Sequence, residues 1–233
     1  MANDNFTFRQ FTVRQDRCAM KVGTDGVLLG AWAAGGRRML DIGTGTGLVA
    51  LMMAQRFPDG QITAVEIDTE ACRQASENVQ NSPFADRLQV LCSSVQDYQA
   101  EEKYDVIVSN PPFYDNSLRC PDGSRSKARH TETLTYRDLF FAVDRLLQPD
   151  GIFSAVIPTD CLSAFVAEGI LRGFSVVRKT LVKTVPRKPA RRALVAFSRQ
   201  GGGPCPVEEV CLMDADGQRS SWYSALTEAF YLR

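Results

Sequence analysis

The sequence of 233 residues contains a single histidine, His130, and no Cys-x-x-Cys pair, so the common histidine and cysteine patterns of metal sites are missing. It also has no nucleophile-elbow serine motif and no phosphate-loop lysine motif. The absence of these motifs argues against a serine hydrolase and against a nucleoside triphosphatase with a phosphate-binding loop. We therefore expect no metal, and a reaction that proceeds without one.

Long apolar runs are missing as well. No run approaches the length that spans a bilayer, and the N-terminus lacks a basic region followed by an apolar stretch. The seven cysteines are odd in number and scattered, which favours reduced thiols over a disulfide framework. We therefore expect a cytoplasmic protein that is neither secreted nor inserted in a membrane.

The most informative segment that is present is a glycine-rich turn. Asp41 is followed by Gly43, Gly45 and Gly47, between an apolar run typical of a buried strand and a segment, 48–57, of helical periodicity. Glycine permits positive φ and lets the backbone approach a ligand at a helix N-terminus. Residues 45–50 also satisfy the relaxed dinucleotide-binding pattern, so the loop alone leaves a nicotinamide enzyme possible.

An acidic residue follows at the end of the next predicted strand. Glu66 lies nineteen residues beyond Gly47, where its carboxylate can accept hydrogen bonds from both hydroxyls of a ribose. Asp68 faces the same way from an extended segment, but it is also placed to cap a helix that begins at Thr69. The loop and the acids together predict an adenosine-containing ligand.

The sequence Asn110-Pro111-Pro112-Phe113 follows a predicted strand, 104–109, whose C-terminal end should open on the same crevice. The two prolines make the turn stiff. The side-chain oxygen of Asn110 and a main-chain carbonyl, that of Pro111, can each accept one hydrogen of an exocyclic amino group, while Phe113 stacks on the ring. Holding both hydrogens frees the nitrogen lone pair to attack a sulfonium methyl, with no strong base required. The simpler alternative is a surface turn with a buried phenylalanine.

These motifs resemble those of class I S-adenosylmethionine-dependent methyltransferases of the amino-methylating branch. Both ends of the chain, at 8–32 and 222–231, look like the bacterial tRNA1(Val) (adenine37-N6)-methyltransferase family, and that similarity covers nearly the whole chain. The resemblance implies S-adenosylmethionine as methyl donor, S-adenosylhomocysteine as product and adenine 37 of a tRNA as target.

The resemblance also assigns contacts with the cofactor. Thr24 and Asp25 match the segment that contacts its methionine end. Many relatives carry an aspartate after the third strand to contact the adenine, whereas this chain has Ser93 and Ser94, with Asp97 three residues later. We take Ser94 as the expected contact on that side.

Alternating segments predict an α/β fold, Rossmann-like, with a seven-stranded mostly parallel sheet, an antiparallel C-terminal hairpin and helices on both faces. With 44% hydrophobic residues, we expect one domain over 1–233, made of a cofactor and substrate segment (1–36), a core (37–200) and an extension packed on it (201–233). The predicted strands are 39–42, 62–66, 88–92, 104–109, 152–157, 174–185 and 193–198, with a further edge strand at 207–213. The predicted helices are 48–57, 69–81, 136–147 and 161–171, with another from 221.

Basic residues cluster although the 27 basic and 27 acidic residues cancel. Residues 178–192 contain seven basic residues and no acid, and a second cluster follows the Asn-Pro-Pro-Phe turn. Such loops can neutralise tRNA phosphates while one base is turned into the pocket, although a solvated basic face is the simpler explanation. The predicted RNA contacts are Arg125, Lys127, Arg129, His130, Arg187, Lys188, Arg191 and Arg192.

Three other functions fit the same motifs. Guanine-N2 RNA methyltransferases and protein-glutamine methyltransferases also act on a planar amino group and share the Asn-Pro-Pro element, although the glutamine enzymes usually carry tyrosine where Phe113 stands. A non-catalytic RNA-binding protein that keeps a cofactor pocket is the third. No obligatory protein partner is evident from the sequence.

Overall fold

The structure, a computed structural model, describes residues 4–18, 20–112 and 134–232. Phe113, which is predicted to stack on the ring of the substrate, lies outside the described residues. So do four of the predicted RNA contacts, namely Arg125, Lys127, Arg129 and His130.

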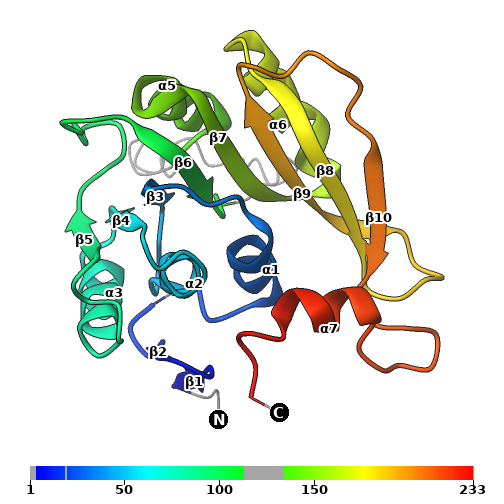
Figure 1. Cartoon of the computed structure of the whole chain (residues 1–233), viewed down its shortest axis with the longest axis horizontal. Coiled ribbons are helices and arrows are strands. Elements are labelled where there is room, and N and C mark those ends of the chain that lie inside the picture. Colours follow the sequence, from blue (N-terminus) through cyan, green and yellow to red (C-terminus); the bar gives the residue numbers. More distant parts are fainter. Residues whose placement is uncertain (1–3, 19, 113–133, 233) are drawn as a thin grey trace, which may run out of the picture.

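An eight-stranded sheet forms the centre of the molecule, with the strand order β10-β8-β9-β7-β6-β3-β4-β5 (Figure 1). Strands β3, β4, β5, β6 and β7 all run parallel to one another. Strand β9 lies between β7 and β8 and runs antiparallel to both. The strands are β3 (Arg38–Ile42), β4 (Gln61–Glu66), β5 (Leu88–Cys92), β6 (Tyr104–Ser109), β7 (Leu147–Pro158), β8 (Ser175–Lys183), β9 (Ala190–Ser198) and β10 (Val207–Cys211). The predicted Rossmann-like fold class, with its antiparallel hairpin, is confirmed.

The predicted number of seven strands is wrong, because the edge strand near the C-terminus joins the main sheet. Strand β10 pairs in parallel with β8, from Val207 opposite Lys179 to Cys211 opposite Lys183. Its side chains support the pairing: Lys183 Nζ lies 2.6 Å from Glu209 Oε2, and Thr180 Oγ1 donates to Glu208 Oε2 at 2.8 Å. The added strand uses main-chain groups of β8 that would otherwise form an open edge.

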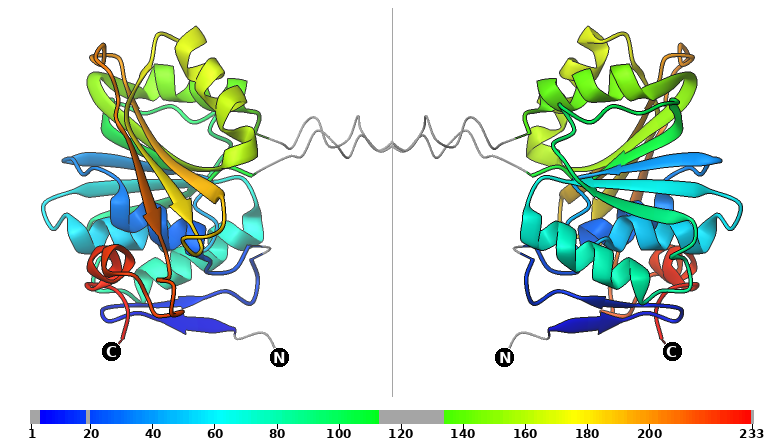
Figure 2. Two further views of the ribbon diagram at one scale, coloured as in Figure 1. Left: turned by 90° about the vertical axis from the view of Figure 1, so that its right-hand side faces the viewer. Right: turned by 90° about the vertical axis from the view of Figure 1, so that its left-hand side faces the viewer.

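Helices cover both faces of this sheet, as the edge-on views of Figure 2 show. Successive residues of a strand point to opposite faces, so Met39 of β3 packs into one hydrophobic core and Leu40 into the other. On the first face lie α1 (Thr24–Trp32), α2 (Leu48–Arg56), α3 (Thr69–Gln80) and α7 (Ser221–Thr227). On the second lie α5 (Tyr136–Leu146) and α6 (Leu162–Leu171), the latter preceded by the short 3-10 helix η1 (Thr159–Cys161).

Two short strands at the N-terminus, β1 (Asn5–Thr7) and β2 (Thr12–Arg14), form a separate antiparallel sheet that the sequence did not predict. This sheet lies beside the C-terminal residues (Figure 2), where the rings of Phe8 and Tyr231 stack with centroids 5.9 Å apart. Phe11 and Trp32 are buried. Within the described part of the chain, no helix has the length and apolar character needed to cross a membrane.

Candidate active site

The glycine loop joins β3 to α2 at the C-terminal edge of the sheet. All three of its glycines have left-handed backbone, with φ of 70° at Gly43, 56° at Gly45 and 83° at Gly47, which L side chains rarely adopt. The main-chain N–H groups of Gly43 and Thr44 donate to the carbonyl oxygen of Val65 at the end of β4, at 2.9 and 3.2 Å. The loop is therefore bound to the neighbouring strand and lies close to the end of β4.

Asp41, the last residue but one of β3, lies buried beneath this loop with 1% of its surface exposed. The Thr44 hydroxyl donates to Asp41 Oδ2 at 2.5 Å. Burial raises the pKa of Asp41 from 3.8 to about 7, because the carboxylate is removed from water; the nearby Glu66 charge adds to this rise, while hydrogen bonds from Thr44 and Ala50 oppose it. Asp41 thus stabilises the glycine loop through its hydrogen bond with Thr44.

Glu66, the last residue of β4, supports the loop from the side. It is 9% exposed, and its two carboxylate oxygens accept hydrogen bonds from the main-chain N–H groups of Gly45, at 2.8 Å, and Asp68, at 3.0 Å. Asp68 is the N-cap of α3, because its side chain accepts from Ala71 N at 2.7 Å. The capping position expected for Asp68 is therefore observed, although Asp68 also lies on the wall of the cavity described below.

The turn after β5 carries the serines that replace the expected aspartate. The Ser94 hydroxyl donates to Asp97 Oδ2 at 2.7 Å and accepts from Asp97 N at 3.1 Å. The main-chain N–H of Ser93 donates to the carbonyl of Glu66 at 2.9 Å, which joins this turn to the end of β4. Ser94 is therefore engaged by Asp97, and both residues lie on the cavity wall.

These turns surround one cavity of about 1000 Å³, a volume at the upper end of the range usual for small-molecule sites. It brings together most of the residues that the sequence singled out, from α1, from the ends of β3, β4 and β6, and from β9. The predicted residues on its wall are Thr24, Asp25, Asp41, Gly43, Gly45, Glu66, Asp68, Ser94, Asn110, Pro112 and Arg192.

Five other predicted residues lie elsewhere. Gly47 is the N-cap of α2, and Pro111 is buried between two lining residues of the chain, Asn110 and Pro112. Arg187, Lys188 and Arg191 are exposed in and beside the turn between β8 and β9, outside the cavity lining. Within the described ranges, no three His, Cys, Asp or Glu side chains are grouped as metal ligands would be.

Asn110 follows directly on β6 and faces the cavity. The end of β6 is fixed beside β3 because the Ser109 hydroxyl donates to the carbonyl of Ile42 at 2.9 Å. The Asn110 amide nitrogen lies 4.0 Å from the sulfur of Met20, while its Oδ1 atom is buried and has no hydrogen-bond partner among the described residues. A buried acceptor without a partner costs free energy, so this oxygen is available for a donor that enters with a ligand.

Arg192 of β9 and Asp25 of α1 form an ion pair on the cavity wall. About a third of each side chain is exposed, 31% for Arg192 and 28% for Asp25. The sequence had placed Arg192 with the RNA and Asp25 with the cofactor, and it gave no sign that they meet. Their contact links the β8–β9 hairpin to the first turn of α1.

Another wall of the cavity lies within the segment 1–36, which was expected to bind cofactor and substrate, but its lining residues were not among the predicted site residues. Residues 14–18 and 20–22, which we call the N-terminal strap, run from β2 towards α1 and contribute Arg17, Cys18, Met20 and Lys21 to the lining. No periodicity marks these residues as functional; their signals are the family resemblance of residues 8–32 and the basic charge of Arg17 and Lys21. Ile67, Val95, Gln96 and Leu134 also line the cavity without having been predicted.

A parallel sheet with a glycine loop after one strand, an acid at the end of the next and an Asn-Pro-Pro turn beside them is the architecture of a Rossmann-like methyltransferase. The sequence model of the methyltransferase small domain family matches residues 22–180. The chain is 49% identical over its full length to a tRNA1(Val) (adenine(37)-N6)-methyltransferase of Bacteroides thetaiotaomicron, of which it covers 99%. It is 47% identical, over 99% of the chain and 98% of the relative, to the protein of the same name from Aeromonas hydrophila.

The fold comparison agrees. A predicted O-methyltransferase from Agrobacterium tumefaciens superimposes with a TM-score of 0.71 over 88% of this chain and 96% of its own, at 18% sequence identity. The chain therefore belongs to the methyltransferase small domain family and, at the sequence level, to the tRNA1(Val) (adenine(37)-N6)-methyltransferases. The family predicted from the motifs is confirmed.

Proposed function

We propose that this protein transfers a methyl group from S-adenosylmethionine to the N6 amino group of adenine 37 in tRNA1(Val). The names of its full-length relatives support the substrate. The observation that carries the chemistry is the buried Oδ1 atom of Asn110, which has no partner in the described structure and faces the same cavity as the glycine loop. As the substrate is a tRNA, we place the enzyme in the cytoplasm.

The cavity residues fit the proposed cofactor. Its volume accommodates an adenosine with an amino-acid tail, and the Glu66 carboxylate lies at the end of β4, where it can accept from ribose hydroxyls. The backbone of Gly43 and Gly45 lies on the wall with left-handed φ, which allows close approach of the ligand. Thr24 and Asp25 would contact the methionine end and Ser94 the adenine side. The cofactor supplies an electrophilic methyl group on a sulfonium centre.

Asn110 is the proposed holder of the target amine. Its Oδ1 atom accepts one hydrogen of the exocyclic amino group, and a main-chain carbonyl, that of Pro111, accepts the other. Both bonds favour a pyramidal nitrogen, whose lone pair is then no longer delocalised into the adenine ring. The methylated nitrogen is acidic and loses its extra proton to solvent, so no side chain has to act as a strong base. Phe113 would stack on the base.

The hairpin between β8 and β9 is the proposed RNA-binding surface. Arg187, Lys188 and Arg191 are exposed there, and Arg192 lies on the cavity wall. We propose that the first three neutralise tRNA phosphates, which would hold the anticodon loop over the cavity. Arg125, Lys127, Arg129 and His130, which lie outside the described residues, stay predicted contacts of the same kind.

The direct test is methylation of unmodified tRNA1(Val) by the purified protein with labelled S-adenosylmethionine, followed by nuclease digestion and mass analysis of the nucleosides. We expect one N6-methyladenosine per tRNA, and none when adenine 37 is replaced by guanine. Methylated guanosine in either RNA would indicate guanine-N2 activity instead. If no RNA accepts the label, protein glutamine is the next substrate to test, and bound RNA without any transfer would indicate a binding protein.

A further inference from the structure

The N-terminal strap covers the cavity from the glycine loop to the candidate active-site turn. A Cβ atom built on Gly45 would lie 3.8 Å from the sulfur of Cys18, so this part of the strap lies directly over the loop. Met20 reaches Asn110, with 4.0 Å between its sulfur and the amide nitrogen. Within the strap, Gln15 Oε1 accepts from Val22 N at 2.7 Å, which closes the segment on itself. The strap is therefore a wall that a bound cofactor would touch.

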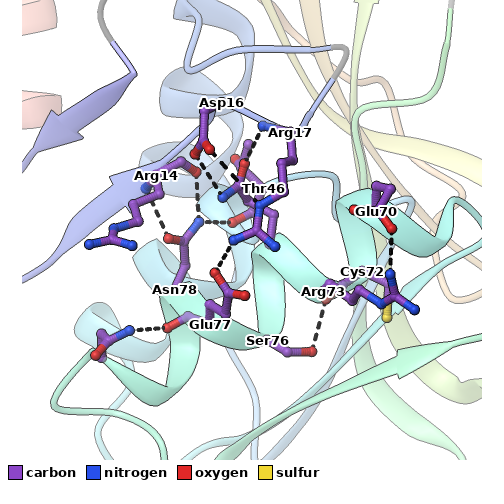
Figure 3. Close-up of polar contacts among 12 residues, drawn as sticks. Arg14, Asp16, Arg17, Thr46, Glu70, Cys72, Arg73, Ser76, Glu77 and Asn78 are labelled. Carbon is purple, nitrogen blue, oxygen red and sulfur yellow. Dashed lines mark hydrogen bonds and ion pairs between the residues drawn. The ribbon is translucent and has the colours of Figure 1, made fainter.

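Helix α3 fastens the strap through two buried amide side chains. Asn78, 2% exposed, accepts from Arg14 N and donates to Arg14 O, both at 2.9 Å (Figure 3). Gln74, 0% exposed, accepts from Arg17 N at 2.7 Å and donates to Asp16 Oδ1 at 3.1 Å. The two residues are four apart, so they lie on the same face of the helix, one turn from each other.

Asn78 also holds the glycine loop. Its amide nitrogen donates to the carbonyl of Thr46 at 2.9 Å, in addition to its bond with Arg14 (Figure 3). Thr46 lies on the cavity wall between Gly45 and Gly47. A single buried side chain thus joins the loop beneath the cofactor cavity to the strap above it.

Charged contacts at the surface reinforce this attachment. Arg17 forms an ion pair with Glu77 of α3 (Figure 3). The pKa of the Asp16 carboxyl is held below its ordinary value by a main-chain hydrogen bond and by the hydrogen bond from Gln74. Ordinary core packing does not need this network, because an apolar face of α3 would bury as well at lower cost. The amides instead fix main-chain groups at the end of β2 and in the irregular segment that follows it.

We infer that Gln74 and Asn78 are positioning residues for the cofactor, which hold the strap and the glycine loop at the spacing that S-adenosylmethionine requires. This inference rests on the proposed function for the identity of the ligand. Neither residue lines the cavity, so both act through main-chain groups of Arg14, Arg17 and Thr46. Their loss should loosen the strap, weaken cofactor binding and speed cofactor release.

The test is calorimetric binding of S-adenosylhomocysteine, without tRNA, to the wild-type protein and to Asn78→Leu and Gln74→Leu. Each replacement removes the side-chain partner of main-chain groups in or beside the strap, so we expect about tenfold weaker binding in each variant. Val79→Ala is the matched control: Val79 is buried on the same helix but packs in the hydrophobic core, so its loss lowers stability without touching the strap. Its affinity for S-adenosylhomocysteine should stay at the wild-type value.

The outcomes separate the two proposals. If the wild-type protein does not bind S-adenosylhomocysteine, the proposed function fails. If it binds and the two leucine variants bind equally well, despite a lower melting temperature, then Gln74 and Asn78 are merely structural and this inference is wrong.

A second variant covers the case in which the leucine variants do not fold. Asp16→Ala removes one bond to Gln74 from the exposed side of the strap, so it should fold. It should bind S-adenosylhomocysteine a few fold more weakly, raise the KM for S-adenosylmethionine and leave kcat unchanged. Hydrogen exchange at the amides of Arg14 and Arg17 should also be faster, and unchanged binding together with unchanged exchange would overturn the inference.

Discussion

At the residue scale, the side chain of Asn110 gives the most direct link between the structure and the proposed chemistry. Its buried oxygen is unpartnered among the described residues, although the side chain lies on a stiff turn at the end of β6. In most proteins such an atom has a partner, and a donor group that enters with a ligand would offset the cost of its isolation here. The Asn-Pro-Pro pattern predicted the position, but the missing partner is visible only in the structure.

We predict that Asn110→Ala lowers methyl transfer by roughly a hundredfold to a thousandfold, the loss typical of removing one positioned transition-state hydrogen-bonding group. S-adenosylhomocysteine affinity, measured by calorimetry, should change little. The melting temperature should not fall, because the substitution removes a buried acceptor that lacks a partner. A parallel loss of cofactor affinity would mean that Asn110 holds the cofactor and not the target amine.

Asp41 predicts a pH dependence of stability. Its pKa is about 7 in the folded protein, raised by burial from 3.8, so the folded state holds a proton that the unfolded state has lost between these values. The resulting stabilisation is present in full below pH 4 and is lost as the pH rises through 7.

The variant Asp41→Asn stays neutral and lacks this loss. Its unfolding free energy relative to wild type should therefore rise by about 3 kcal/mol between pH 5 and pH 8, as measured by urea denaturation. Asp59→Asn is the control, because it removes an exposed carboxylate. An Asp41→Asn difference that is the same at both pH values would show that the buried carboxyl is ionised throughout.

At the scale of elements, strands and cofactor turns were predictable while α1 was not. Strands β3, β4 and β6 carry short apolar runs that end at the turns, and the left-handed glycines can be read directly from Gly43 to Gly47. Helix α1 contains two glycines and is buried from Gly26 to Trp32, so it shows no amphipathic period. A Cβ atom on Gly30 would lie 2.8 Å from Met52 Cβ, so this glycine serves close packing of α1 on α2 and not a turn.

The lining residues of the strap were not predicted, for a different reason. Its attachment depends on side chains that are distant in sequence: Asn78 lies 64 residues from Arg14, and Gln74 lies 57 from Arg17. Buried glutamine and asparagine on a helix carry no local signal, since the same residues are common on exposed faces. The edge strand at β10 was predicted, but five residues of mixed polarity do not reveal which strand they pair with.

The β8–β9 hairpin yields a prediction about RNA binding. Arg187 and Lys188 are exposed in its turn and lie outside the cavity lining, so the double variant Arg187→Ala/Lys188→Ala should raise the KM for tRNA and leave kcat unchanged. If each residue neutralises one phosphate, the slope of log affinity against log salt should fall in magnitude by about two. Filter binding at several salt concentrations measures it.

Arg37→Ala is the matched control for this double variant. Arg37 is exposed and directly precedes β3. It therefore lies at the N-terminal ends of the parallel strands, whereas the cavity lies at their C-terminal ends. It should leave both the KM and the salt slope at wild-type values. Equal effects of the two variants would indicate a general influence of net charge, and no effect of either would place the tRNA on another surface.

At the scale of the whole molecule, the net charge does not reveal the proposed RNA-binding surface. The net charge is zero, yet seven basic residues and no acidic ones lie between 178 and 192. Strand β10 brings Glu208 and Glu209 alongside β8, where Glu209 pairs with Lys183, so part of the hairpin charge is neutralised locally. The turn at Arg187 and Lys188 lies beyond the reach of these pairs, and the unbalanced charge is therefore concentrated there.

The two ends of the chain are in contact, and we expect this contact to contribute to the free energy of unfolding. Arg9 N donates to the carbonyl of Phe230 at 2.8 Å, and the Phe230 ring is 1% exposed within the core that α1 and α2 share. Phe230→Ala should lower the unfolding free energy by about 3 to 5 kcal/mol, as measured by urea denaturation, because the cavity it leaves lies in a close-packed core. Leu232→Ala, at a residue 61% exposed, should cost no more than about 0.5 kcal/mol. If both variants cost equally little, the packing of Phe230 does not contribute measurably to stability.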